Sequence, residues 1–184
     1  PSSCWLLTGE SGSGKTKCCQ QLARTAREKG WRVGGILSET VFEDGMKKGI
    51  LARDLYTDES RPLARDAALS TRHEGLSDIP ESPRALALGR WLFDPRGIAW
   101  GNQVLARRTP LEVLVVDELG PLEFLRGEGW VNALDALRSS FYGLAVAVVR
   151  PSLVHLAKEQ LPITRVIEPS FPINDIFLSK LPDR

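Results

Sequence analysis

The sequence is poor in the residues from which metal clusters, disulfide frameworks and membrane spans are built. Its 184 residues include only two histidines and three cysteines. His73 and His155 are far apart and show no zinc-ligand spacing. No uninterrupted apolar stretch is long enough for a membrane helix, and no signal-peptide pattern opens the sequence. We therefore expect neither a zinc protein nor a membrane protein.

An excess of charge of one sign is also lacking. The 24 Lys and Arg residues nearly balance the 23 Asp and Glu residues, so no basic surplus indicates a nucleic-acid partner. The hydrophobic content of 42% is typical of a globular protein, and we expect one domain spanning residues 1–184. We interpret the cysteines, at positions 4, 18 and 19, as buried apolar side chains in a reducing, cytoplasmic compartment.

What the chain does contain is a phosphate-binding loop. Residues 9–16 match the pattern G-x-x-x-x-G-K-[ST] at every fixed position, between an apolar run at 4–7 and a helical apolar stripe over 19–26. Glycines let backbone N–H groups turn toward a phosphate, Lys15 supplies a charge for the outer phosphates, and the Thr16 hydroxyl is a hard ligand for Mg²⁺. The predicted nucleotide-binding residues are Gly9, Glu10, Ser11, Gly12, Ser13, Gly14, Lys15, Thr16 and Lys17.

An acidic partner for the metal ion follows the most apolar strand candidate, residues 111–118. Ligands of open α/β sheets bind at the carboxyl ends of strands, so Asp117 is predicted to ligate Mg²⁺ together with Thr16. Glu118 comes next and is predicted to orient or deprotonate a water that attacks the γ-phosphate. The alternative, a polar turn that merely ends a strand, fits an intact phosphate loop less well.

Residues 117–120 also satisfy D-x-x-G, which signalling GTPases use to sense the γ-phosphate. Those proteins read guanine through an N/T-K-x-D signature, and this sequence has none, since Asn132 precedes Ala133 and Asn174 precedes Asp175. A regulatory GTPase is therefore disfavoured. The glutamate beside Asp117 instead favours an NTPase with its own catalytic carboxylate.

The alternation of strand and helix patterns predicts an α/β fold with a mostly parallel central sheet flanked by helices. Continuous aliphatic runs at 111–118 and 143–149 are typical of parallel strands buried on both faces. Turn signals after residues 41 and 56 predict an antiparallel hairpin region. The remaining candidates are strands over 33–41, 49–56, 63–65, 86–93 and 163–167, helices over 97–107, 131–137 and 154–160, and an irregular excursion over 71–84 that could act as a lid.

Several segments, in this order, resemble the THEP1-type nucleoside-triphosphatase family. They are the phosphate loop, Val33 to Glu39, Lys48 to Ile50, Arg61 to Ala64 and Asp117 to Glu123. The resemblance runs from residue 5 to about residue 160. It implies a RecA-like P-loop NTPase fold, Mg²⁺, and hydrolysis of ATP, GTP and other nucleoside triphosphates with little base selectivity. It also implies phosphate and metal contacts at Lys15 and Thr16, completed by Asp117 and Glu118.

Two elements common in that family are replaced here. Val148 to Ser152 stands where a Thr-x-His-like group is usual, and only Asn174-Asp175 remains of an Asn-Arg-Asp element. Arg150 is predicted to reach the γ-phosphate from a strand next to that of Asp117, the alternative being an exposed arginine beside a proline turn. Further arginines that could close over phosphates are Arg53, Arg90 and Arg96.

Other acidic and aromatic residues are candidates for functional roles, but we favour structural roles for them. Glu39 and Glu123 are candidate carboxylates supporting the site. Among the five tryptophans, those at 5 and 91 are interpreted as core residues, and those at 31 and 130 as partly exposed.

The sequence thus predicts a Mg²⁺-dependent nucleoside-triphosphatase that hydrolyses the γ-phosphate by in-line attack of water. Its predicted catalytic residues are Lys15, Glu118 and Arg150. One alternative is a small-molecule or nucleotide kinase, which needs an acceptor site that the sequence does not specify. Another is a nucleotide-operated partner or chaperone protein with slow hydrolysis, which would bind an unidentified protein through the hairpin region.

Overall fold

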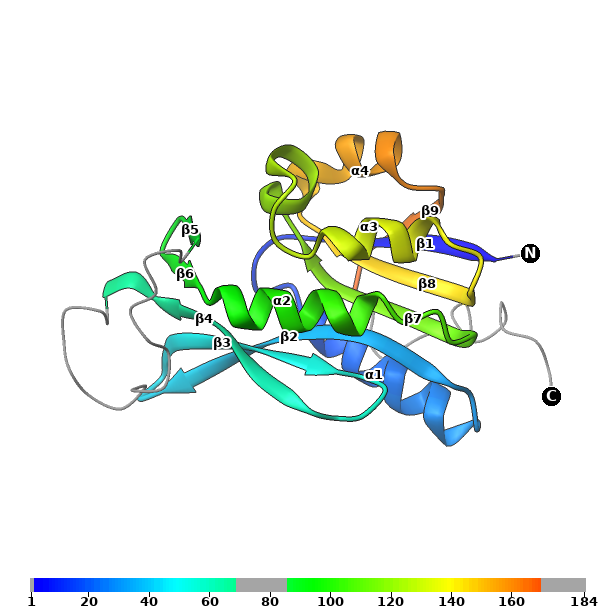
Figure 1. The fold of residues 1–184 in the computed structure, drawn as a ribbon, viewed down its shortest axis with the longest axis horizontal. Helices are drawn as coiled ribbons and strands as arrows, with labels where there is room; N and C mark the ends of the chain where they lie inside the picture. The colour runs from blue at the N-terminus through cyan, green and yellow to red at the C-terminus, as the bar shows by residue number, and fades with distance from the viewer. Residues whose placement is uncertain (1, 69–85, 170–184) are drawn as a thin grey trace.

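The computed structural model describes residues 2–68 and 86–169, and the strands within them form one continuous sheet (Figure 1). The order of the nine described strands is β5-β6-β4-β3-β2-β7-β8-β1-β9. The strands are β1 (Ser3–Thr8), β2 (Val33–Glu43), β3 (Met46–Asp54), β4 (Ser60–Asp66), β5 (Leu86–Leu88), β6 (Trp91–Phe93), β7 (Leu111–Leu119), β8 (Tyr142–Val149) and β9 (Ile163–Ile167). The helical elements are α1 (Lys15–Glu28), α2 (Pro95–Leu105), the π-helical turn η2 (Leu122–Arg126), α3 (Val131–Arg138), the 3-10 turn η3 (Pro151–Leu153) and α4 (Val154–Gln160).

Five neighbouring strands, β2, β7, β8, β1 and β9, are parallel. β7 and β8 lie among them with Val115 and Val148 fully buried. Aliphatic side chains suit both faces of these strands because helices cover both: α2 and α3 lie in front of the sheet and α1 behind it (Figure 1). The predicted α/β fold with a parallel core flanked by helices is confirmed.

The sheet separates two apolar layers, because successive strand side chains point to opposite faces. In β1, Cys4 and Leu6 pack in the cluster that includes residues of α2, α3 and α4. Trp5 and Leu7 pack in the other cluster, with the buried stripe of α1. This alternation fixes the register of β1, and therefore the point at which the phosphate loop leaves the sheet.

The antiparallel region extends the sheet beyond β2 through β3, β4, β6 and β5. β2 belongs to both parts: its first half pairs with β7 and its second half with β3, from Ile36 onward. Asp44 and Gly45 turn the chain at positive φ between β2 and β3. The predicted hairpin region is confirmed, and it is a direct continuation of a core strand.

The single strand predicted over 86–93 is wrong. This segment is itself a hairpin, in which Leu88 of β5 lies opposite Trp91 of β6. Gly89 sits between them at a φ of 58°, a conformation that ends an extended run and that glycine adopts without steric cost. A glycine in the middle of an apolar run was the available signal for the turn.

Helix α2 begins earlier than the predicted range of 97–107. Asp94 precedes it as an N-cap, and its carboxylate accepts a hydrogen bond from the Arg96 N–H at 2.9 Å, with Pro95 at the first helical position. The excursion predicted over 71–84, His73 within it, and the Asn174-Asp175 pair lie outside the described residues.

The tryptophans are buried in a pattern that differs from the prediction. Trp5 is a core residue, as expected, with 2% of its surface exposed. Trp91 is only half-buried because it stands on the short edge hairpin. Trp31 and Trp130, predicted as partly exposed, are buried. The Trp130 indole fits against α2 at Gly101, where an added Cβ would lie 2.3 Å from Nε1.

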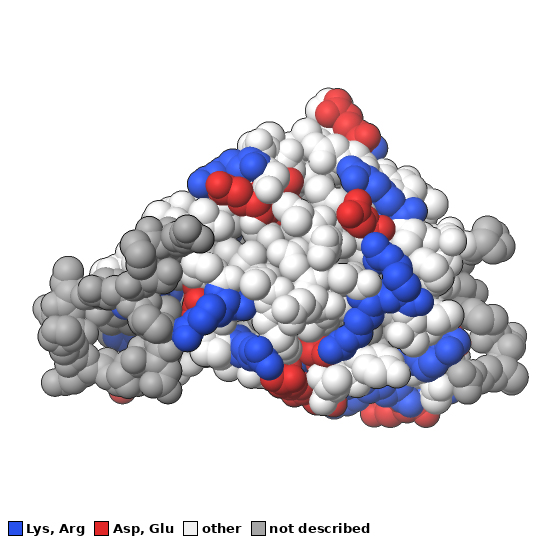
Figure 2. Space-filling view, in the orientation of Figure 1, with Lys and Arg blue, Asp and Glu red and all other residues white. Residues whose placement is uncertain are grey.

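Acidic and basic side chains are interspersed on the face shown in Figure 2, around a broad uncharged centre. Many described charges form ion pairs, such as Arg32–Glu112 at 3.0 Å and Arg126–Glu128 at 2.7 Å. Among the helices of the described residues, none has the length and apolar character that crossing a bilayer requires.

Candidate active site

The site forms where the parallel strands end, because their carboxyl ends meet at one edge of the sheet. β1 and β8 run in register with Thr8 opposite Val149, so the phosphate loop and Arg150 leave the sheet together. The parallel pairing of β2 with β7 likewise brings Ser38 beside Asp117. Residues from four distant stretches of sequence, namely the phosphate loop, Ser38, Asp117 and Arg150, are thereby gathered at the same place.

The phosphate loop turns into α1 at Gly14, which has a φ of 91°. The helix starts without a side-chain cap and without an acidic residue in its first turn, so its N-terminal N–H groups are suited to an anion. Lys15 is buried, and its Nζ donates hydrogen bonds to the carbonyls of Gly9 at 2.6 Å and Glu10 at 2.8 Å. The loop therefore wraps around the lysine ammonium. Lys17, also predicted to bind nucleotide, is exposed on α1.

Asp117 is almost completely buried, with 1% of its surface exposed. Burial raises its pKa to about 7, and the negative charge of Glu118 acts in the same direction. Hydrogen bonds from the Thr16 hydroxyl and the Ser38 N–H, together with the charge of Lys15, favour the ionised form. This carboxylate is thus in contact with the phosphate loop and lacks enough positive charge nearby to offset its burial.

The Thr16 hydroxyl and the Asp117 carboxylate are suited to bind a magnesium ion. Mg²⁺ in nucleotide sites binds through one or two protein oxygens, with phosphates and waters completing an octahedron. Thr16 and Asp117 supply a hydroxyl and a carboxylate that already touch, and a divalent cation would compensate the buried charge. The described residues contain no cluster of three His, Cys, Asp or Glu side chains that could hold a metal by themselves. A site completed by the nucleotide agrees with that donor set.

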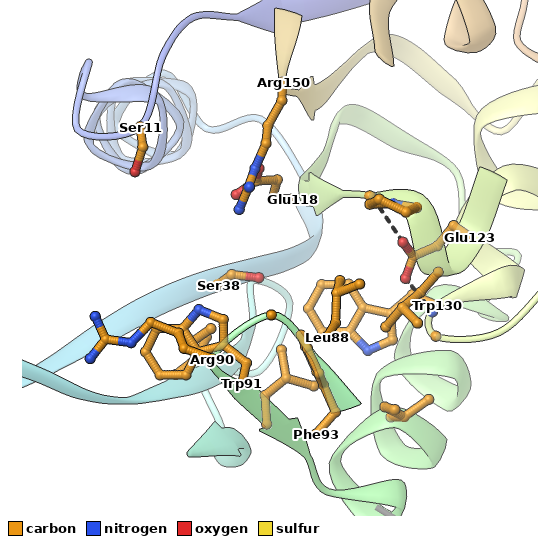
Figure 3. Close-up of a pocket in the computed structure, with 18 of the residues that line it drawn as sticks. Ser11, Ser38, Leu88, Arg90, Trp91, Phe93, Glu118, Glu123, Trp130 and Arg150 are labelled. Atoms are coloured by element: carbon orange, nitrogen blue, oxygen red, sulfur yellow. Dashed lines mark hydrogen bonds and ion pairs between the residues drawn. The ribbon is translucent and has the colours of Figure 1, made fainter. Parts of the chain in front are cut away.

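Glu118 and Arg150 face each other beside the loop (Figure 3). Arg150 Nε donates to Glu118 Oε1 at 2.9 Å. Both side chains are partly exposed, at 34% for Glu118 and 62% for Arg150, so solvent and a ligand can reach them. The structure brings together Lys15, Thr16, Asp117, Glu118 and Arg150, the residues that the sequence predicted as catalytic or metal-binding.

Glu123 is a buried carboxylate that shapes the chain after β7. It accepts hydrogen bonds from the N–H groups of Gly120 and Trp130, each at 2.8 Å (Figure 3). An added Cβ at Gly129 would lie 2.1 Å from its Oε1, so the loop closes tightly on this side chain. Glu123 therefore holds the segment that follows Asp117 and Glu118.

Glu39 and the remaining predicted arginines form contacts within the fold. Glu39 links β2 to α1 and β3, accepting from Gln20 Nε2 at 2.8 Å and pairing with Arg53 at 3.4 Å. Arg96 pairs with Asp94, the capping residue of α2. Arg90 pairs with Asp66, and of these three arginines it alone lines the pocket that also contains Arg150.

That pocket, of about 550 Å³, adjoins the phosphate loop at Ser11. Glu118, Arg150 and Ser38 border it on the side of the strand ends, and the antiparallel region forms the opposite side (Figure 3). The sequence did not predict the pocket, because its walls come from segments far apart in the chain.

Ser38 is the residue of the site that sequence reasoning missed. Its N–H donates to Asp117 Oδ2 at 3.3 Å, and its hydroxyl donates to the Asp117 backbone carbonyl. A single serine within a predicted strand does not by itself indicate a functional site. Only the strand order, with β2 next to β7, places it beside the buried carboxylate.

Comparison with known proteins gives the family of this chain. A family model described as NTPase matches residues 4–161, which is most of the chain. The chain belongs to this NTPase family. The matched range includes the phosphate loop, Asp117, Glu118 and Arg150.

Several relatives in the NTPase family are named nucleoside-triphosphatase THEP1. The protein from Thermococcus kodakarensis is 31% identical over 147 residues, covering 79% of this chain and 75% of the relative. The one from Methanopyrus kandleri is 28% identical over 164 residues, covering 87% of this chain and 83% of the relative. The THEP1-type resemblance drawn from the motifs is confirmed.

Solved structures of the NTPase family share the fold. A human cancer-related nucleoside triphosphatase aligns with a TM-score of 0.65 at 21% identity, covering 97% of this chain and 94% of that one. THEP1 from Aquifex aeolicus aligns with a TM-score of 0.61 at 19% identity, covering 96% and 95%. At these identities the likeness extends to the architecture of the sheet and helices.

Proposed function

We propose that this member of the NTPase family is a Mg²⁺-dependent nucleoside-triphosphatase that hydrolyses the γ-phosphate of ATP, GTP and other nucleoside triphosphates with low base selectivity. The observation that carries the proposal is the contact between Thr16 of the phosphate loop and the buried Asp117, with Glu118 and Arg150 next to it. The names of the THEP1 relatives support the reaction class.

The phosphate loop binds the nucleotide through backbone N–H groups of residues 9–17 and the start of α1. On binding, the Lys15 ammonium exchanges its hydrogen bonds to the Gly9 and Glu10 carbonyls for the outer phosphates. Thr16 and Asp117 would hold Mg²⁺, which would neutralise negative charge on the β- and γ-phosphates. These groups align the phosphoryl group for in-line attack, which is the main catalytic need of phosphoryl transfer.

Glu118 takes the proton of the attacking water, or orients that water toward phosphorus. Arg150 reaches the γ-phosphate and stabilises its charge in the transition state. Support comes from their shared position: Glu118 lies near the end of β7, Arg150 directly follows β8, and the two side chains lie 2.9 Å apart next to the loop. Movement of Arg150 to the phosphate would also release the Glu118 carboxylate for its role as a base.

The test is steady-state phosphate release from ATP, GTP, CTP and UTP, with Mg²⁺ and with EDTA. We expect turnover of all four within about one order of magnitude of each other and loss of turnover in EDTA. Lys15→Ala serves as the matched variant and should weaken nucleotide binding. Hydrolysis of a single nucleotide, or full hydrolysis without a divalent cation, would contradict the proposal.

A second candidate reaction is phosphoryl transfer to a small molecule. The pocket beside Glu118 and Arg150 is the observation that favours it, because a kinase needs room for an acceptor next to the γ-phosphate. Free phosphate released with water as the sole acceptor supports hydrolysis.

We also propose that residues 1–184 act as one P-loop NTPase domain in the cytoplasm. Cys4, Cys18 and Cys19 are all buried as thiols, which agrees with a reducing compartment.

A further inference from the structure

The pocket next to the phosphate loop is larger than hydrolysis requires. Hydrolysis needs one water beside the γ-phosphate, and one water needs about 10–15 Å³ of cavity volume. The pocket encloses about 550 Å³, within the usual range of sites for small organic ligands. Its volume therefore leaves room for a second organic molecule.

The position of the pocket relates such a molecule to the nucleotide. Of the residues of the phosphate loop, only Ser11 is among its described lining residues, and Glu118 and Arg150 stand at the same end. In Figure 3 Arg150 and Glu118 point into the space between Ser11 and Ser38, and the pocket continues from there toward Trp91 and Phe93. A ligand in it would lie beyond the γ-phosphate, away from the rest of the loop.

The walls of the pocket are mainly apolar and include three aromatic rings, those of Trp91, Phe93 and Trp130. Trp91 and Phe93 are only half-buried, although each stands on a strand of the sheet. Aromatic side chains left open to a cavity favour a flat or aliphatic ligand body. The aliphatic lining residues are Ile50, Leu63, Leu88, Ile98, Pro121 and Leu122.

The charges of the lining are unevenly distributed. Glu118 is paired with Arg150, and the Glu123 carboxylate is held by the backbone N–H groups of Gly120 and Trp130. On the opposite side, Arg90 donates to the Lys47 carbonyl at 3.2 Å, which brings two cationic residues together. Arg90 is paired with Asp66, but Lys47 forms no ion pair with any carboxylate of residues 2–68 and 86–169.

We propose that this pocket binds a second small molecule beside the nucleotide, an organic anion with an aromatic or aliphatic body. The body packs between Trp91, Phe93 and Trp130, and the anionic group faces Lys47 and Arg90. Its place next to the γ-phosphate rests on the proposed function, whereas binding in the pocket does not. The ligand is of the kind that an acceptor or an effector of the nucleotide reaction would be.

The experiment uses the full chain and the fluorescent aromatic sulfonate 8-anilinonaphthalene-1-sulfonate as the probe. We expect one saturable site per chain, retained when saturating ADP and Mg²⁺ fill the nucleotide site. Displacement of the dye by ADP would assign it to the nucleotide site and overturn the proposal, as would the absence of a saturable site. The assay needs no turnover, so it can fail while hydrolysis stands.

Two variants that fill the pocket, Ile50→Trp and Leu88→Trp, should each abolish dye binding. Circular dichroism identifies whichever of them is folded, and a folded one that still binds the dye fully would refute the pocket as the site. Leu125→Ser is the control, because Leu125 is 65% exposed and does not line the pocket. It should leave dye binding unchanged.

The contribution of the Lys47 charge to ligand binding is tested with lysine-to-glutamate variants. Lys47→Glu should weaken sulfonate binding by about tenfold, equivalent to about 1.4 kcal/mol. Lys158→Glu, which makes the same charge change on α4 outside the lining, should have little effect. The neutral analogue N-phenyl-1-naphthylamine should bind both variants equally. Equal losses in the two variants would contradict the assignment of Lys47 to the anionic group.

Discussion

The Glu118 carboxylate and the Arg150 guanidinium are each other's partners in this structure, 2.9 Å apart. A carboxylate oxygen that accepts a charge-assisted hydrogen bond has one lone pair engaged and is less available to a water molecule. In the proposed mechanism the γ-phosphate, with its higher negative charge, would compete for the same guanidinium. Nucleotide binding would thus bring Arg150 to the γ-phosphate and release the Glu118 carboxylate in one step. Before the nucleotide binds, the ion pair holds Glu118 in position.

This exchange leads to a prediction for Glu118→Gln. The amide retains the size of the side chain but cannot accept a proton, so kcat should fall by about 100-fold or more while nucleotide affinity changes little. Phosphate release gives kcat, and a fluorescent nucleotide analogue gives affinity. Arg150→Ala serves as the comparison, since it should lower kcat through lost charge stabilisation. Full hydrolysis by Glu118→Gln would remove Glu118 from the mechanism.

A second residue-scale prediction concerns the cysteines. Cys4, Cys18 and Cys19 are each no more than 2% exposed, and burial raises the pKa of Cys4 to about 11. Burial also raises the pKa of Cys19, with the charge of Asp117 acting in the same direction. Thiolates are the reactive form, so all three thiols should resist iodoacetamide at pH 8 in the native protein. Mass spectrometry should show three alkylated cysteines after denaturation, whereas rapid native labelling would contradict this burial.

At the scale of elements, β2 approaches β7 so closely that a side chain is excluded. Gly35 has a φ of 107°, and an added Cβ would lie 1.9 Å from the Val115 carbonyl oxygen. Both strands run on toward the site, where Ser38 meets Asp117. The close approach is therefore part of what sets the position of the buried Asp117 carboxylate.

Gly35→Ala should consequently destabilise the protein by about 3 kcal/mol or more in urea denaturation, because both the backbone and the neighbouring strand resist a methyl group. Gly45→Ala is the matched control. Gly45 has a φ of 73° but no neighbour within 4 Å of the added Cβ, so only the backbone cost of about 1 kcal/mol remains. Equal losses in the two variants would show that backbone conformation alone accounts for the effect.

The elements that the sequence predicted correctly are those with a strong local signal. β7 and β8 are continuous aliphatic runs, and the phosphate loop has glycines at fixed spacing, so burial and turn geometry are visible in the residues themselves. The 86–93 segment was misjudged because its apolar residues outweighed the single glycine that turns it. The apolar pattern of this segment predicted one extended strand, but the positive φ of Gly89 turns the chain into a hairpin.

The parts of the site that could not be predicted depend on tertiary neighbours. The position of Ser38 and the walls of the pocket depend on which strands are adjacent in the sheet. No single segment of the sequence shows that strand order. Trp130 was expected to be partly exposed because it borders a helix, yet α2 covers it where Gly101 leaves room. By contrast, the motifs alone predicted Asp117 and Glu118 as site residues, and the structure places Asp117 in contact with Thr16 of the loop and Glu118 beside Arg150.

On the scale of the whole molecule, the site lies at the carboxyl ends of the parallel strands, at the edge of the sheet that separates the two apolar layers. The phosphate loop leads into α1 on one face, while η2 and α3 follow β7 on the other. A nucleotide held by the loop, Asp117 and Arg150 would connect β1, β7 and β8 at their ends. Binding should therefore stabilise the fold as a unit and not only the loop.

Ligand binding to the native state raises the free energy of unfolding by RT ln(1 + [L]/Kd), about 2.7 kcal/mol at a hundredfold excess over Kd. For a chain of this size that corresponds to a rise in Tm of roughly 5 to 10 °C, measured by scanning calorimetry with ADP and Mg²⁺. ADP is used because it cannot be turned over at the γ-phosphate. Lys15→Ala should lose most of the shift, since its ammonium no longer offsets phosphate charge inside the loop. An equal shift in that variant would place the nucleotide elsewhere on the protein.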